Sequence, residues 1–67
     1  MTQLDSITIK AARIDRGYTQ EGLAALLGVS KRTIGTWENN RMNIPKHILL
    51  SLAYLYEMEV EQLRVEE

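Results

Sequence analysis

Hydrophobic positions in this chain recur at the spacing of short helices. In residues 20–27, Leu23, Ala24 and Leu27 share one helical face, since they stand at positions i, i+1 and i+4. From residue 31 to about 39, Ile34 and Trp37 share one side and polar side chains occupy the other. The pattern predicts two helices of about two turns each, one directly after the other.

Capping residues separate the two predicted helices. Thr19 precedes the first helix and Ser30 the second, and a hydroxyl at such a position accepts from a free backbone N–H. Gly28 tolerates the positive φ that ends a helix. Val29 and Ile34 have the spacing of a hydrophobic staple, which fixes the entry angle of the second helix. The segment therefore predicts a helix-turn-helix.

A helix is also expected before this motif, from about Ser6 to Arg16. Ile7, Ala11 and Ile14 fall at i, i+4 and i+7 and form its expected buried stripe. Ile9 lies on a neighbouring edge of that stripe.

Two further helices are expected after the motif. Pro45 suits the first turn of a helix that continues to about Tyr56, and residues 59–64 predict a short fifth helix. No hairpin dipeptide or sustained alternation indicates a strand. We therefore expect an all-α fold of five short helices, with the helix-turn-helix at the second and third, in a single domain over residues 1–67.

Composition excludes several classes of protein. The chain has no cysteine, which removes disulfides and thiolate metal sites and fits a reducing cytoplasm. No signal peptide is visible, and the longest aliphatic run, residues 48–50, cannot span a bilayer. One histidine and no catalytic, phosphate-loop or metal-ligand motif argue against an enzyme, a metal or a cofactor. We expect a cytoplasmic protein with no membrane partner and no small-molecule ligand.

Charge is distributed unevenly along the chain. The net charge is −1, but residues 10–47 carry a net +4 and residues 48–67 a net −4. A basic part joined to an acidic far end would orient a protein on a polyanion, although small soluble proteins also segregate charge by chance.

The exposed face of the predicted helix at 31–39 carries the candidate binding groups. Arg32 and Thr36 point away from Ile34 and Trp37, with Lys31 beside them. Arginine and lysine donate to guanine in the major groove, and threonine bonds a base or touches a thymine methyl. Because the N-terminal part of such a helix meets the base edges, these three residues are the predicted base readers.

Phosphate contacts are expected around the same face. The N-terminus of the helix at 20–27 presents free N–H groups and a positive dipole end near Thr19 and Gln20. We expect Ser30, at the start of the next helix, to contact phosphate as well. Surface solvation of the cations and ordinary capping by the two hydroxyls would explain each of these residues separately. Their position together on one side of a helix-turn-helix favours nucleic acid.

At residues 9–63 the chain resembles the lambda-repressor-like, Xre-type helix-turn-helix family of phage repressors, Cro proteins and bacterial regulators. The resemblance rests on IKAARIDRGYTQ, LAALLGVSKRTIGTWEN, the proline that opens the fourth helix, and LAYLYEMEVEQL. It implies a compact five-helix domain that binds operator DNA, usually as a dimer on two half-sites. It also implies that Gln20 contacts phosphate, that Asn39, Asn40 and Arg41 hold the DNA backbone, and that Arg13 and Glu38 form an ion pair tying the first helix to the third.

Four residues depart from the family pattern. Gly22 replaces a common acidic residue and removes a capping box, and Gly35 lies inside the recognition helix, where glycine costs about 1 kcal/mol relative to alanine. Asn40 and Glu57 stand where glycine is usual.

We therefore expect a transcriptional regulator, a phage- or prophage-type repressor or Cro-like protein that binds a palindromic operator in double-stranded DNA. A homodimer, weak or DNA-induced, is expected through the fifth helix and the end of the fourth, because one short helix reads few bases. The competing hypothesis is a protein-interaction module of the same fold, of the antitoxin, anti-repressor or coactivator-bridging type.

Overall fold

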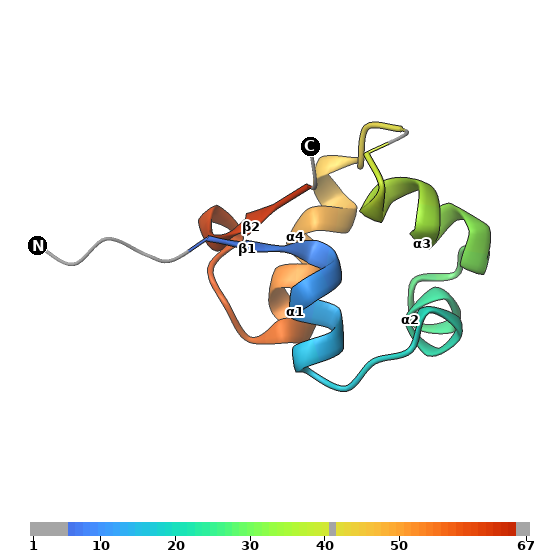
Figure 1. Cartoon of the computed structure of the whole chain (residues 1–67), viewed down its shortest axis with the longest axis horizontal. Coiled ribbons are helices and arrows are strands. Elements are labelled where there is room, and N and C mark those ends of the chain that lie inside the picture. The colour runs from blue at the N-terminus through green and yellow to red at the C-terminus, as the bar shows by residue number, and fades with distance from the viewer. Residues whose placement is uncertain (1–5, 41, 66–67) are drawn as a thin grey trace, which may run out of the picture.

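Helices dominate the computed structural model, which describes residues 6–40 and 42–65 (Figure 1). Four α-helices lie in this part of the chain, so the fold is mostly helical, as predicted. The elements follow in the order β1 (Ile7–Thr8), α1 (Ile9–Asp15), α2 (Gln20–Leu27), α3 (Lys31–Glu38), α4 (Lys46–Tyr56), the 3-10 turn η1 (Val60–Gln62) and β2 (Leu63–Arg64).

A small parallel sheet joins the two ends of the domain. β1 and β2 pair with Ile7 opposite Leu63 and Thr8 opposite Arg64. The expectation of no strand was therefore wrong, and so was that of a fifth α-helix over residues 59–64, where η1 is followed by β2. Strands of two residues are too short to show alternation, and their partners lie at opposite ends of the sequence. No local pattern could have predicted them.

The first helix begins three residues later than expected. The Thr8 hydroxyl accepts from the backbone N–H of Ala11 at 3.1 Å and caps α1, so Ser6 is not its start. The buried face of the helix is consequently Ile9, Ala12 and Arg13. From the predicted stripe, Ile7 packs partly buried against the core from β1, but Ala11 is exposed. Ile14 is 59% exposed, which corrects its assignment to the core.

The turn between α2 and α3 follows the expected chemistry. Gly28 adopts φ 72°, and the next amide, of Val29, donates to the Ala24 carbonyl at 3.0 Å. Thr19 caps α2 by accepting from the Gly22 N–H at 2.9 Å, and Ser30 caps α3 by accepting from the Thr33 N–H at 3.1 Å. These bonds set the angle between the two helices.

Both ends of α4 are fixed by particular residues. We expected Pro45 in the first turn of this helix, but it is the residue before the helix, with an extended ψ of 144°. Glu57 ends α4 with φ 56°, a conformation that glycine adopts more easily. The Arg16 guanidinium donates to the Tyr56 carbonyl at 2.7 Å, and a cation there also suits the negative end of the helix dipole.

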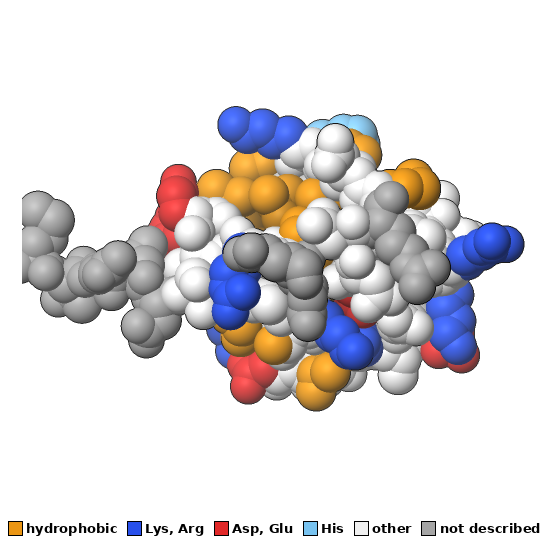
Figure 2. Space-filling view, turned by 45° about the horizontal axis from the view of Figure 1, so that its top comes forward, with side chains coloured by type: hydrophobic (Ala, Val, Ile, Leu, Met, Phe, Trp, Pro, Cys, Tyr) orange, Lys and Arg blue, Asp and Glu red, His pale blue; other side chains and the backbone are white. Residues whose placement is uncertain are grey.

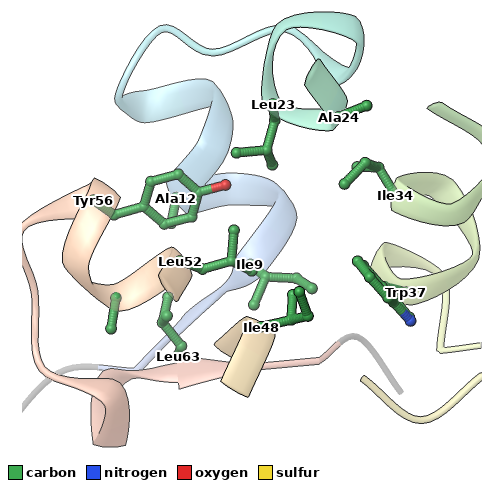
Figure 3. Close-up of a cluster of buried hydrophobic side chains, with 11 residues drawn as sticks. Ile9, Ala12, Leu23, Ala24, Ile34, Trp37, Ile48, Leu52, Tyr56 and Leu63 are labelled. Atoms are coloured by element: carbon green, nitrogen blue, oxygen red, sulfur yellow. The ribbon is translucent and has the colours of Figure 1, made fainter. Parts of the chain in front are cut away.

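The core lies where α1, α2, α3 and α4 converge, with β2 closing one side (Figure 3). Ile34 and Trp37 point into it from α3, on the side opposite the predicted base readers. Its buried members are Ile9 and Ala12 from α1, Leu23 and Ala24 from α2, Ile34 and Trp37 from α3, Ile48, Leu52, Ala53 and Tyr56 from α4, and Leu63 from β2.

Tyr56 predicts an alkaline limit to stability. Burial, followed by the charge of Glu38, raises the pKa of the Tyr56 phenol above its ordinary value of about 10. The phenol ionises more readily in the unfolded chain, so its contribution is complete below about pH 10 and is lost as pH rises further. Among the described residues its hydroxyl has no hydrogen-bond partner. At pH 7 the free energy of unfolding of Tyr56→Phe should therefore lie within about 1 kcal/mol of the wild-type value. Between pH 9 and 11 the free energy of unfolding, measured by urea titration, should fall less in the variant than in the wild type. An equal alkaline loss in both proteins would contradict this.

Gly35 predicts a stabilising substitution. It lies inside α3, and a Cβ added there would meet nothing within 4 Å. Gly35→Ala should therefore raise the free energy of unfolding by about 1 kcal/mol, through the lower entropy cost of alanine in a helix. Gly28→Ala is the matched control and should destabilise, because alanine is strained at φ 72°. Thermal unfolding that moved both variants in the same direction would contradict the assignment.

Candidate nucleic-acid interface

An open groove of about 420 Å³ runs along the exposed side of α3. The three predicted base readers line it together with two of the predicted phosphate contacts, Gln20 and Asn39, whereas Thr19, Ser30 and Asn40 do not line it. Its lining residues are Gln20, Lys31, Arg32, Gly35, Thr36 and Asn39. Figure 2 shows Lys and Arg side chains at the end of the molecule that α2 and α3 form in Figure 1, and others elsewhere on the same face. Residues separated by up to 19 positions in sequence thus share one polar surface.

The two cations of the groove differ in how free they are. Lys31 Nζ lies 3.5 Å from a carboxylate oxygen of Glu21, and both side chains are more than half exposed. A surface pair of this kind is worth at most about 1 kcal/mol and exchanges readily for another anion. Arg32 has no ion-pair or hydrogen-bond partner within the part of the chain that the structure describes. Arg32 is therefore the group best prepared to bind an external acceptor.

Thr36 is half-buried, and its hydroxyl hydrogen is already used. Its Oγ1 donates to the carbonyl of Thr33 at 2.8 Å. Towards a base, the hydroxyl can therefore only accept a hydrogen bond, while the methyl group can make an apolar contact. Adenine N6 and cytosine N4 are the matching donors in the major groove, and the thymine methyl is the matching apolar group.

The capping hydroxyls also keep some capacity to bind. Thr19 accepts from Gly22, but its own hydrogen has no acceptor among the described residues. The Ser30 hydroxyl lies 2.9 Å from that of Thr33, and either can be the donor. Both helix starts can thus still donate to an anion, in line with the positive end of each helix dipole.

The predicted backbone contacts beyond α3 are placed in part. Asn39 and Asn40 are both exposed, and Asn40 adopts φ 57°, the left-handed conformation expected for a helix stop. Arg41 lies outside the described residues.

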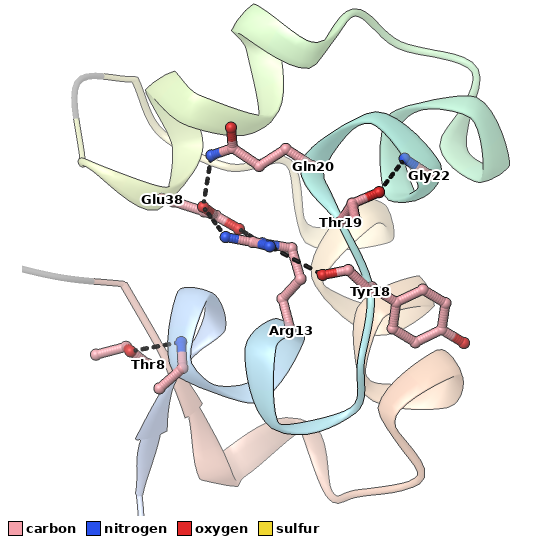
Figure 4. A network of polar contacts seen from close by, with 8 residues as sticks. Thr8, Arg13, Tyr18, Thr19, Gln20, Gly22 and Glu38 are labelled. Carbon is pink, nitrogen blue, oxygen red and sulfur yellow. Dashed lines mark hydrogen bonds and ion pairs between the residues drawn. The ribbon is translucent and has the colours of Figure 1, made fainter.

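A buried ion pair holds α3 against α1 (Figure 4). Arg13 Nε donates to Glu38 Oε2 at 2.7 Å, and both side chains are at least nine-tenths buried. A second guanidinium nitrogen of Arg13 donates to the Tyr18 carbonyl at 2.9 Å. The structure thus brings together the two residues expected to pair, and it adds the loop before α2 to the same cluster.

Gln20 extends this cluster to the groove. Its Nε2 donates to Glu38 Oε1 at 3.1 Å, which leaves the second amide hydrogen and the carbonyl oxygen available (Figure 4). One carboxylate therefore orients a buried arginine and a groove-lining amide. Sequence reasoning did not find this link, because nothing in the spacing of Gln20 and Glu38 reveals that α2 and α3 cross there.

Glu38→Gln should strongly destabilise the domain. The substitution keeps the shape of the side chain but leaves the Arg13 charge buried without a counter-charge, which costs about 3–5 kcal/mol. The matched control is Asp15→Asn at the exposed Arg16–Asp15 pair, which should cost less than about 1 kcal/mol. Equal shifts of the melting temperature by circular dichroism would contradict this. Replacing both partners, as Arg13→Met with Glu38→Leu, should recover much of the loss.

Within the described residues, no helix has both the length and the apolar composition that a bilayer crossing requires, and no group of three or more metal-binding side chains occurs.

Comparison with known proteins identifies the family of this chain. No curated protein and no solved structure matches significantly. The family model described as helix-turn-helix matches residues 9–63, which is most of the chain. The match agrees with the caps, the turn at Gly28 and the groove along α3. The chain therefore belongs to the Xre-type, lambda-repressor-like helix-turn-helix family, whose members are DNA-binding transcription regulators.

Proposed function

We propose that this regulator is a phage- or prophage-type repressor or a Cro-like protein that binds a palindromic operator through α3. The observation that carries the proposal is the groove of α3, which gathers Lys31, Arg32, Thr36, Gln20 and Asn39 on a surface free of exposed large apolar side chains. Such a surface suits polar base edges and phosphates.

Base recognition is assigned to Arg32, Thr36 and Lys31. Arg32 has no partner within residues 6–40 and 42–65, and its guanidinium matches the O6 and N7 acceptors of guanine with two donors. Thr36 contributes an acceptor or its methyl group. Lys31 exchanges Glu21 for a base or phosphate at little cost, since their pair is exposed.

Backbone contacts are assigned to both ends of the motif. Thr19, Gln20 and Ser30 face phosphates at the helix starts, and Asn39, Asn40 and Arg41 do so beyond α3. Glu38 already holds the Gln20 side chain in place, so little further conformational entropy is lost when its free amide hydrogen bonds a phosphate.

We further propose that the protein acts as a homodimer, weak or DNA-induced, on half-sites about one helical turn apart. The expected dimer surface changes in one respect. The fifth α-helix is not formed, and Leu63 is buried within the monomer, so the end of α4 remains from the original expectation. We expect the dimer to act in the cytoplasm, on the nucleoid when it is bound to DNA, without a cofactor or a small-molecule ligand.

Arg32→Ala should weaken binding to a selected operator duplex by about 1–3 kcal/mol, which is about 5- to 150-fold. On a scrambled duplex of equal length the loss should be smaller, because only the phosphate attraction remains. The matched control is Arg64→Ala, which removes the same charge from β2, where Arg64 Nε donates to Ser6. Fluorescence anisotropy at several salt concentrations measures both.

Equal losses from Arg32→Ala and Arg64→Ala on both duplexes would contradict the assignment of α3. An operator affinity that did not fall with salt would contradict DNA binding itself and favour the protein-interaction hypothesis. Circular dichroism of both variants separates these outcomes from unfolding.

A further inference from the structure

A second surface, formed by α2 and α4, is apolar and separate from the groove of α3. It is an open hollow of about 430 Å³, and the two surfaces share no lining residue. Leu26 is 60% exposed, Leu50 47% and Tyr54 84%. Its lining residues, none of them charged, are Leu26, Leu27, Leu50, Ser51, Tyr54 and Leu55. Three large apolar side chains in one patch indicate a surface that another molecule covers.

The charges at the ends of α4 show what kind of molecule fits. Leu50 and Tyr54 are one turn apart on the exposed face of α4. Lys46 lies one turn before Leu50, and Glu57 lies directly after the helix, three residues beyond Tyr54. Both are exposed, and neither has an ion-pair partner among the described residues. The exposed face of α4 is therefore basic at its start, apolar in its middle and acidic at its end.

A surface with this order of charges is complementary to itself when the α4 helices of two copies lie antiparallel. If Leu50 of one α4 packs against Tyr54 of an antiparallel second copy, then the Lys46 end of each helix meets the Glu57 end of the other. A two-fold axis repeats every such contact, as in isologous dimers generally. We infer that the hollow between α2 and α4 is the docking surface for a second copy of this chain, with the two α4 helices antiparallel.

A neighbouring hollow accommodates the end of the partner helix. It measures about 350 Å³, shares Tyr54 with the first and carries Glu57, Met58 and Glu59 in its lining. The aliphatic stem of Lys46 from the second copy lies along Met58 while its ammonium group meets the carboxylates. Apolar contact in the middle and opposite charges at both ends thus fix the orientation of the two copies.

That the partner is a second copy rests on the homodimer proposed above, but the interface itself does not require DNA. Among the described residues, its exposed large apolar side chains are only Leu26, Leu50 and Tyr54, so we expect a weaker dimer than one with a standard interface of about 800 Å² per partner, and a dissociation constant on the order of 10 μM. Sedimentation equilibrium of the full chain without DNA measures it. Leu50→Glu should weaken dimerisation at least about tenfold, because it places a charge in the apolar contact.

Ile14→Glu is the matched control. Ile14 is a comparably exposed apolar residue, 59% exposed on α1, and does not line this hollow. It should leave the dissociation constant within about twofold of wild type. A chain that stays monomeric at about 1 mM, or a dimer equally sensitive to both variants, would overturn the inference.

Charge exchange tests the antiparallel order. Lys46→Glu and Glu57→Lys should each weaken the dimer, and the double variant should restore it, because the opposite charges then face each other again. A double variant weaker than either single variant would overturn the antiparallel arrangement.

Cysteine cross-linking tests the same register directly, since the chain has no cysteine of its own. Under oxidation, a mixture of Leu50→Cys and Tyr54→Cys chains should form mainly the mixed disulfide. Dominant disulfides between identical chains would contradict the register. Because these experiments contain no DNA, their failure leaves the assignment of Arg32 unaffected, and failure of the Arg32 experiment leaves the dimer surface unaffected.

Discussion

The ion pair between Arg13 and Glu38 is the interaction on which the binding surface depends. It joins the end of α1 to the end of α3 at 2.7 Å in a buried setting, and the same two side chains engage the Tyr18 carbonyl and the Gln20 amide. Burying both charges is costly, so the pair adds little net stability, and its value lies in the single arrangement that satisfies all of its partners. That arrangement sets how α3 presents its outer face and how Gln20 enters the groove.

Charge on this small domain is used in two different ways. Cations that look alike in sequence are separated by the fold: Arg13 is buried, Arg16 donates to the end of α4, and Arg32 has no partner among the described residues. Arg13 and Arg16 are engaged within the protein, but their partners Glu38 and Asp15 are already counted in the net +4 of residues 10–47, so the other residues of that range still carry +4. The specificity we propose rests on one free arginine, one exchangeable lysine and one threonine whose hydroxyl can only accept.

Sequence predicted most of the central motif and little of the ends. Thr19, Gly28 and Ser30 act within three or four residues of themselves, so their caps and turn can be recognised locally. Ile7 and Leu63 meet across nearly the whole chain, so the sheet left no local signal. The late start of α1 did leave one, because Thr8 caps the helix by accepting from Ala11, three residues away. The groove residues could be placed on one face by helical geometry alone, whereas the bond from Gln20 to Glu38 required the crossing of α2 and α3. Leu26 lies outside the apolar face predicted for residues 20–27, and the fold shows that Leu26, Leu50 and Tyr54 are all exposed.

Selection of bound sequences from random duplex DNA at two salt concentrations tests whether α3 recognises an operator. If it does, the selected sequences contain a palindromic motif whose half-sites are centred about one helical turn, or a small multiple of it, apart. Enrichment should also weaken at the higher salt concentration as phosphate contacts lose strength. Recovery of no sequence above background at low salt would contradict the account and would assign the α3 groove to a different ligand.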